Sequence, residues 1–497
     1  MKKNDELVLE ITDMTDEGLG VGKADGFIYF VKDSIAGDTV LCGVTKLKKS
    51  YGYARLIRII KSSPDRIEPP CPVARQCGGC QLQQLDYGAQ LRLKENKVKN
   101  ALIRIGGFPE EQIESLMEPI MPSVKQLRYR NKAQFPIGRG KDGGLRAGFY
   151  AGRTHSIIAQ EDCILGAEEN RIVLSAILSW MESHDIAPYD ELSHKGLIRH
   201  VLIRKSRAFS ELMVCIVING RELPNKEELI KTLLDALDKE GSSMLGSLSI
   251  SSNMKATNVI MGDSFSTIYG KPYIEDEIRL FDEQDSDKSL DIKAEALSEG
   301  AVQSVRFRIS PLSFYQVNPL QMEWLYQKAL SYAELRGTET VWDLYCGIGT
   351  ISLFLAQKAG KVYGVEVVPE AIENAKENAK LNGLGNTEFF VGRAEDVLPS
   401  WYEEHKGTGS RGATPDVIVV DPPRKGCDEA CLETMVRMQP KRIVYVSCDP
   451  ATLARDLKYL CQNGYELKRI APCDMFPQTV HCECAVKLER KILKSKK

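Results

Sequence analysis

The first sixty residues alternate apolar and polar positions in short runs that turn residues interrupt. The runs "LVLEITDM", "GFIYFVK", "DTVLCGVTKL" and "YARLIRII" are rich in β-branched and aromatic residues. Glycine and aspartate separate them, as in "DEGLGVGKADG". About five short strands in so short a segment predict a small β-barrel of the OB type over residues 1–61, a common platform for oligonucleotides.

The pattern changes over residues 62–308. "SSPDRIEPP" is typical of a linker, and a helix is predicted from about Tyr87 to Ile105. Further along, β-type alternation surrounds two helical stretches, near residues 167–183 and 225–239. We expect a central α+β domain here, with the helical segment of about residues 84–120 packing on the domain that follows.

From Thr340 onward, apolar strands alternate with helical segments. "TVWDLYC", "KVYGVEV", "VIVVDPP" and "RIVYVSC" are nearly continuous apolar runs, with stretches such as "PEAIENAKENAKLNG" between them. This alternation predicts a mostly parallel sheet covered by helices on both faces. The chain is therefore expected to be an α/β multidomain protein in which residues 309–497 form a Rossmann-like domain.

A Gly-x-Gly turn, Gly347 and Gly349 in "DLYCGIGT", follows the first of these strands. Glycine lets the backbone approach a ligand at the carboxyl end of a strand. Glu366 ends the next strand, where a carboxylate can bind ribose hydroxyls. Thr350–Ser352 replaces the third glycine of the dinucleotide fingerprint, which favours S-adenosylmethionine over NAD. A plain strand–helix turn is the alternative interpretation.

Two other strand ends carry candidate chemistry. Asp421 precedes the stiff Pro422-Pro423 loop of "VVDPPRKG", a loop seen in methyltransferases that act on planar bases; a simple stiff turn is the alternative. In "VSCDPATLARD", Cys448 lies just ahead of a helix with Asp449 as N-cap and Pro450 as first residue. A helix N-terminus favours a thiolate, so Cys448 is either a nucleophile or a buried thiol at the end of a core strand.

Charge adds a second line of argument. The 497 residues carry a net charge of −2, so the net charge does not indicate a nucleic-acid partner. Residues 42–61, 123–155 and 195–207 are nevertheless locally basic, and the first two contain aromatics. Cations bind phosphates and flat side chains stack on unpaired bases, so these segments favour RNA over the alternative of ordinary solvated faces. The acidic stretch Asp282–Glu299 indicates an exposed insertion or flexible connector.

Composition limits the cellular setting. No apolar run approaches the roughly 20 residues of a membrane span, and the start has no apolar signal region. A cytoplasmic protein without a membrane partner is expected. Fourteen cysteines in such a chain favour metal binding or catalysis over a disulfide framework.

Six motifs, in this order, resemble those of the RNA uracil-carbon-5 methyltransferases, which use S-adenosylmethionine and carry an iron–sulfur cluster. They are "CPVARQCGGC", "SPLSFYQVN", "DLYCGIGT", "VVDPPRKG", "VSCDPATLARD" and "DMFPQTVHCE". The resemblance covers essentially the whole chain and implies that the N-terminal barrel is TRAM-like. It also implies that Cys448 is the nucleophile and Glu483 the general base. The implied S-adenosylmethionine ligands are Gln316, Tyr345, Glu366 and Asp421.

The same resemblance implies a [4Fe–4S] cluster in the central domain, held by Cys71, Cys77, Cys80 and Cys163. The local spacing agrees with it, because the cube needs four thiolates and the second Cys-x2-Cys pair of a zinc ribbon is absent. Zinc stays open as an alternative. The competitors of Cys163 for the fourth position, both in apparent strands, are Cys42 and Cys215.

The chemistry of uracil supports a thiol and a base. Carbon-5 is too poor a nucleophile to attack a methyl sulfonium, and addition of a thiolate to carbon-6 activates it. A base must then remove the carbon-5 proton. We expect a monomer that methylates a specific uridine in structured RNA, with 23S rRNA favoured over tRNA. An amino-methyltransferase, which needs no thiol, and a non-catalytic iron–sulfur RNA-binding or ribosome-assembly factor are the alternatives.

Overall fold

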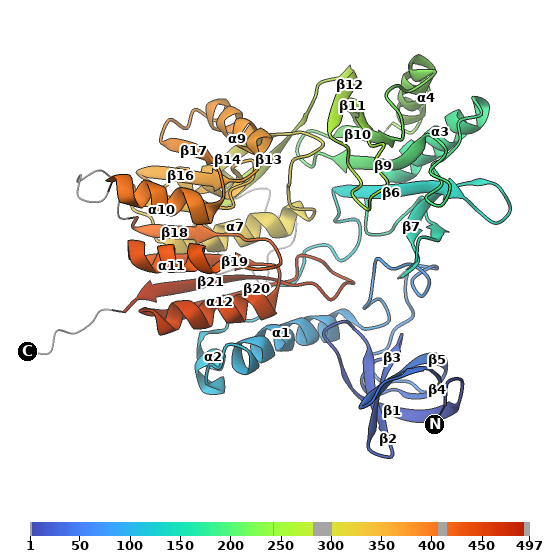
Figure 1. Cartoon of the computed structure of the whole chain (residues 1–497), viewed down its shortest axis with the longest axis horizontal. Coiled ribbons are helices and arrows are strands. Elements are labelled where there is room, and N and C mark those ends of the chain that lie inside the picture. Colours follow the sequence, from blue (N-terminus) through green and yellow to red (C-terminus); the bar gives the residue numbers. More distant parts are fainter. Residues whose placement is uncertain (1, 153, 242, 282–300, 406–414, 492–497) are drawn as a thin grey trace, which may run out of the picture.

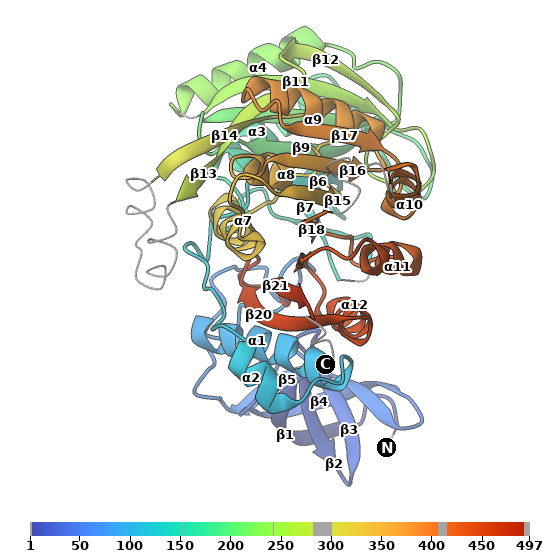
Figure 2. The same cartoon turned by 90° about the vertical axis from the view of Figure 1, so that its left-hand side faces the viewer.

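A computed structural model describes residues 2–152, 154–241, 243–281, 301–405 and 415–491. The predicted acidic insertion, Asp282–Glu299, lies outside the described residues. No helix in the described ranges is both long and apolar enough to cross a membrane. Figures 1 and 2 show a small barrel at one end of the molecule and two larger sheets beyond it.

The N-terminal strands form a closed barrel in the order β1-β2-β3-β5-β4, as the alternating pattern predicts. In β1 every second side chain, including Leu9 and Ile11, is buried among apolar residues of the other strands. The alternation therefore fills the barrel and leaves polar side chains outside. The strands are β1 (Glu6–Met14), β2 (Gly20–Ala24), β3 (Phe27–Lys32), β4 (Thr39–Leu47) and β5 (Tyr51–Lys61).

Two helices follow the barrel, α1 (Tyr87–Arg104) and α2 (Glu110–Leu116). The predicted helix is confirmed as α1. Asp86 is its N-cap, and the Asp86 side chain accepts hydrogen bonds from two N–H groups of the first turn. Val98 and Leu102 of α1 are buried in the same apolar core as one face of the C-terminal sheet. Figure 1 shows α1 running from the barrel beneath that sheet.

The central part is a seven-stranded sheet in the order β12-β11-β10-β9-β6-β7-β8. The two predicted helices are confirmed as α3 and α4, whose apolar side chains pack on one face of the sheet. The other face meets the hairpin β13-β14 through Leu202 and Met213. The elements are β6 (Lys132–Arg139), β7 (Leu145–Tyr150), β8 (Ile157–Ala159), α3 (Glu169–Ser183), β9 (Ile198–Lys205), β10 (Glu211–Ile218), α4 (Lys226–Lys239), β11 (Met244–Ser252), β12 (Ser264–Gly270), β13 (Ile274–Phe281) and β14 (Ala301–Ile309).

The C-terminal sheet has the order β17-β16-β15-β18-β19-β21-β20. All its neighbouring pairs are parallel except those that involve β21. Its strands are β15 (Thr340–Leu344), β16 (Lys361–Glu366), β17 (Thr387–Val391), β18 (Val417–Val420), β19 (Arg442–Ser447), β20 (Tyr465–Cys473) and β21 (Glu483–Arg490). Its helices are α7 (Pro319–Ala333), α8 (Thr350–Ala356), α9 (Pro369–Leu381), α10 (Ala394–His405), α11 (Glu429–Met438) and α12 (Pro450–Gln462).

Strand β18 shows why the apolar runs of this sheet are continuous. Val417 and Val419 belong to the core that contains residues of α7, α8 and α9, whereas Ile418 and Val420 belong to the core with α10, α11 and α12. A strand covered on both faces needs apolar side chains at every position. The predicted doubly covered parallel sheet is confirmed.

Candidate active site

The candidate nucleophile and base meet because of strand direction. β18 and β19 are parallel neighbours, so Asp421 and Cys448, which follow them, lie at the same edge of the sheet. β21 runs antiparallel to β19 and pairs Ser447 with Cys484. Its first residue, Glu483, therefore lies at the edge where the parallel strands end. Residues far apart in the sequence are brought to one place where α/β sheets bind ligands.

Cys448 is half-buried at this edge. Asp449 caps α12 as predicted, since its side chain accepts hydrogen bonds from Ala451 and Thr452. The expected stabilisation of a thiolate is nevertheless wrong: burial raises the pKa of Cys448 to about 12. The charges of Glu483 and Asp421 act in the same direction, and Arg424 only partly opposes them. The thiol is therefore protonated at neutral pH, and its activation requires a proton acceptor.

Two carboxyl groups next to the thiol supply such an acceptor. Glu483 is only 2% exposed, and burial raises its pKa well above the usual range, with a further contribution from the charge of Asp421. Burial also raises the pKa of Asp421 to about 7. Within the described chain, Oε2 of Glu483 has no hydrogen-bond partner. Neighbouring carboxyls in a dry site hold protons more tightly than solvated ones, as general acid–base groups need to do.

The segment that leads to Glu483 is fastened to helix α1. Nζ of Lys94 donates to Oδ1 of Asp474 over 2.5 Å and to the carbonyl oxygen of Phe476 over 3.0 Å. Gln90 and Gln478 exchange two hydrogen bonds of 3.0 Å, one between side chains and one from the Gln478 N–H. Sequence reasoning missed these contacts, because no local signal relates α1 to a segment about 380 residues later.

The cofactor side of the edge is formed by Glu366 and the glycine turn. The Gly347 N–H donates to Oε2 of Glu366 over 3.2 Å, and the N–H groups of Val367 and Val368 donate to Oε1. A Cβ atom added at Gly347 would meet no atom within 4 Å, so open space adjoins this carboxylate. Val367 is 58% exposed beside it. A fixed carboxylate, open space and exposed valines suit a ligand with ribose hydroxyls and a flat apolar ring.

The other two expected cofactor residues are held differently. Gln316 is 4% exposed, and its carbonyl oxygen accepts a hydrogen bond from Asn131 over 3.1 Å. Tyr345 has a φ of 68°, an uncommon conformation for a residue with a side chain. The structure therefore places Tyr345 at the edge, next to Asp421, whose N–H lies 3.4 Å from the Leu344 carbonyl oxygen.

Cys71, Cys77 and Cys80 lie within ten residues of one another, and Cys163 is near enough for its charge to act on Cys77 and Cys80. Burial raises the pKa of Cys80 to about 12, and the charges of Cys163, Cys77 and Cys71 all contribute. The Gly79 N–H donates to Sγ of Cys77 over 3.4 Å, as its place in the motif suggests. The donor set suits an iron–sulfur centre. Among the residues that the structure describes, however, no three His, Cys, Asp or Glu side chains are close enough to hold a metal ion.

The competitors of Cys163 lie elsewhere. Cys42 is buried in β4 and Cys215 in β10, and burial is the largest cause of the raised pKa of each thiol. Cys163 is a distant cysteine whose charge acts on Cys77 and Cys80 of the "CPVARQCGGC" motif.

Comparison with known proteins places these features in a family. The model of tRNA (uracil-5-)-methyltransferases matches residues 286–491, and that of the TRAM domain matches residues 2–57. An RNA methyltransferase of Halalkalibacterium halodurans is 46% identical over 491 residues, which are 99% of this chain and 98% of that protein. A second, from Bacillus cereus, is 45% identical over 490 residues, with coverage of 99% and 98%.

A solved structure is similar over the same extent. It is the Pyrococcus abyssi tRNA (uracil-54, C5)-methyltransferase in complex with S-adenosyl-L-homocysteine, with a TM-score of 0.72 and 26% identity. The match covers 97% of this chain and 99% of that one.

Proposed function

The chain belongs to the family of S-adenosylmethionine-dependent RNA uracil-5-methyltransferases, and from this premise we propose that it works through a covalent bond between Cys448 and a uridine. The observation that carries the proposal is the pairing of a half-buried thiol with a buried carboxyl group whose Oε2 has no partner among the described residues. A carboxyl group without a role in the reaction would be expected at the solvated surface, because burying it without a hydrogen-bond partner is unfavourable.

The proposed reaction starts at Cys448. The thiol loses its proton to Asp421, because a pKa of about 7 leaves this carboxyl group partly ionised at neutral pH and so able to accept one. Sulfur then bonds to carbon-6 of the uracil ring, and the electron pair of the ring double bond moves toward carbon-5. Bound S-adenosylmethionine supplies the methyl group as an electrophile. Carbon-5 thereby becomes tetrahedral, carrying both its proton and the new methyl group.

Glu483 completes the proposed reaction. The carbon-5 proton must leave before the bond between sulfur and carbon-6 breaks and the ring double bond returns. A buried carboxylate is a stronger base than a solvated one, because burial raises its pKa. Glu483 is buried, and its pKa is raised for this reason. Glu366, Gln316, Tyr345 and Asp421 are the residues we propose to hold the cofactor at the strand ends.

We further propose that Cys71, Cys77, Cys80 and Cys163 bind a [4Fe–4S] cluster with a structural role. The charge of Cys163 acts on both Cys77 and Cys80, and this proximity supports the assignment. Methyl transfer involves no net electron transfer, so a redox role is not required.

Ribosomal RNA, and 23S rRNA in particular, is the proposed target, because the barrel and the cysteine-rich part offer two RNA-binding elements beside the catalytic domain. Transfer RNA is the second candidate. The similarity to the Pyrococcus abyssi tRNA enzyme favours it.

A single experiment tests the target and the thiol together. Purified protein is incubated with labelled S-adenosylmethionine and bulk RNA from cells that lack the gene, and the methylated position is mapped. We expect 5-methyluridine at one site, and no label with Cys448→Ala. The matched control is Cys461→Ala, a half-buried cysteine on α12, which should remain active. Substantial methylation by Cys448→Ala would overturn the covalent mechanism and favour an amino-methyltransferase.

A further inference from the structure

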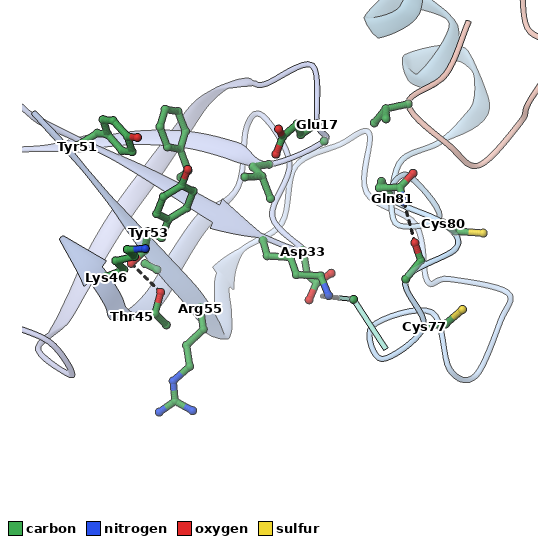
Figure 3. Close-up of a pocket in the computed structure, with 18 of the residues that line it drawn as sticks. Glu17, Asp33, Thr45, Lys46, Tyr51, Tyr53, Arg55, Cys77, Cys80 and Gln81 are labelled. Atoms are coloured by element: carbon green, nitrogen blue, oxygen red, sulfur yellow. Dashed lines mark hydrogen bonds between the residues drawn. The ribbon is translucent and has the colours of Figure 1, made fainter. Parts of the chain in front are cut away.

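The glycine turn beside the cofactor site and the candidate base must stand at a fixed distance for a methyl group to reach a bound uracil. The base is held from the barrel side. The N–H groups of Gln81 and Leu82 each donate to the Gln478 carbonyl oxygen over 3.1 Å. Gln478 lies five residues before Glu483, and Figure 3 shows Gln81 beside Cys80 at the end of the cysteine loop. The glycine turn needs a support of its own.

Helix α7 reaches both parts. It packs against β18, β19 and β21, which end or begin at the catalytic edge, and against α8, which begins after the glycine turn. Tyr326 of α7 is 2% exposed, and its ring lies 6.1 Å from that of Phe354 on α8, measured between centroids. The Tyr326 hydroxyl lies 3.2 Å from Oγ1 of Thr350, the first residue of α8. Tyr326 therefore joins the helix that packs on the catalytic strands to the residue that follows Gly349.

The phenol of Tyr326 lies near the carboxyl groups of the site. Burial raises the pKa of Tyr326, and the charge of Asp421 raises it further. The charges of Asp343 and Glu483 act in the same direction. The hydroxyl is therefore protonated at neutral pH, and it takes part in the site as a neutral hydrogen-bonding group rather than as a charge. It is close to the catalytic carboxyls and is bonded to the residue after the glycine turn.

These contacts explain the stretch Thr350–Ser352, which replaces the third glycine of the dinucleotide fingerprint. The Ser352 hydroxyl donates to Oδ2 of Asp343 on β15, and both residues are fully buried. Thr350 is 9% exposed, and its hydroxyl bonds Tyr326. Both hydroxyls thus bind groups inside the fold, and the start of α8 is anchored to β15 and to α7. A glycine at either position would lose its anchor.

We propose that Tyr326 is a positioning residue for methyl transfer. Through its bond with Thr350 it sets where the glycine turn, and the cofactor held there, stands relative to Asp421 and Glu483. Methyl transfer needs the sulfur of the cofactor, the methyl carbon and carbon-5 of uracil in line, so a small displacement of the turn slows the reaction without preventing binding. The inference rests on the proposed function for the roles of the two carboxyl groups.

Removal of the bond from each end tests the proposal. Tyr326→Phe and Thr350→Val each delete one hydroxyl and nearly keep the shape of the side chain. Each is expected to lower the single-turnover rate constant of methyl transfer by about 2- to 10-fold, as the loss of one neutral hydrogen bond does, with an unchanged KM for RNA. Thr350→Ser retains the hydroxyl and should recover most of the rate that Thr350→Val loses. The matched control is Tyr332→Phe on the same helix, whose hydroxyl donates to Glu118 over 2.6 Å.

The double variant decides whether the two residues act through one bond. Tyr326→Phe combined with Thr350→Val is expected to be no slower than the slower single variant, because the second change removes nothing further. Independent effects would multiply instead. Rate losses that multiply, an unaltered rate in Tyr326→Phe, or an equal rate loss in Tyr332→Phe would each overturn the assignment.

The outcome for Tyr326 stays separate from that for the catalytic proposal, because each variant is compared with the unaltered protein whichever residue acts as nucleophile. If Cys448→Ala methylates RNA while Tyr326→Phe is slow, the covalent mechanism fails and the positioning role stands. If Cys448→Ala is inactive and Tyr326→Phe is as fast as the unaltered protein, only the positioning role fails.

Discussion

The buried ion pair between Lys94 and Asp474 is expected to hold the active site together. Both side chains are at most 1% exposed, and Nζ lies 2.5 Å from Oδ1. Lys94→Met removes this pair and the hydrogen bond to the Phe476 carbonyl oxygen. The Asp474 carboxylate would remain in a dry site without its cation, and water cannot screen the charge. Removing one partner of a buried pair costs about 3–5 kcal/mol.

Urea unfolding followed by a probe of the C-terminal domain measures this loss. With a slope of about 2–3 kcal/mol/M, the midpoint is expected to fall by about 1–2.5 M. Lys255→Met is the matched control, because its pair with Asp263 is more than half exposed and should contribute at most about 1 kcal/mol. The double variant Lys94→Met with Asp474→Leu should recover most of the midpoint, since an apolar pair of similar size often replaces a buried ion pair.

Kinetics distinguishes positioning from general stability. The segment from Asp474 onward leads directly to Glu483, so Lys94→Met should lower kcat more than it raises the KM for RNA at a temperature where the variant is folded. A midpoint shift below about 0.3 M with an unchanged kcat would refute the reasoning, because the pair would then contribute no more than a surface pair does.

Three further predictions address the site and the cysteines. Glu483→Gln should slow turnover by about 10²–10⁴-fold and let a methylated RNA–protein adduct accumulate, which denaturing gels detect; fast turnover without adduct would contradict the assignment of the base. Because burial raises the pKa of Asp421 from 3.8 to about 7, the folded protein keeps a proton that the unfolded chain releases, so stability falls as pH rises through this window. In Asp421→Asn the melting temperature should fall less with rising pH than it does in the unaltered protein. Identical pH profiles of the two proteins would argue against the raised pKa of Asp421. Cys163→Ser should lose iron and visible absorbance on anaerobic purification while Cys215→Ser keeps both, and equal iron in the two variants would count against the ligand set.

Local pattern was enough to predict the elements of this fold. The barrel, α1 and the doubly covered parallel sheet follow from the spacing of apolar residues and from caps such as Asp86, which depend on neighbours in sequence. The approach of Glu483 to Cys448 depends on β21 entering the sheet antiparallel beside β19. The resemblance of motifs indicated both residues, whereas spacing alone could not.

Electrostatic properties were the least predictable. The helix after Cys448 suggested a thiolate, but the pKa of a side chain depends on what surrounds it in space. Burial and two carboxyl groups from β21 and the end of β18 raise it instead. The Lys94–Asp474 pair was not predicted for the same reason. Neither residue has a distinctive sequence neighbourhood, and the two meet only because α1 packs against the last strands.

The covalent step is tested most directly by trapping it. RNA that contains 5-fluorouridine at the mapped position cannot release a carbon-5 proton, so the bond between sulfur and carbon-6 should persist. Peptide mass spectrometry of the denatured complex is expected to find the nucleotide attached to Cys448. An enzyme that methylates natural RNA but yields no adduct, or an adduct on a different cysteine, would contradict the account.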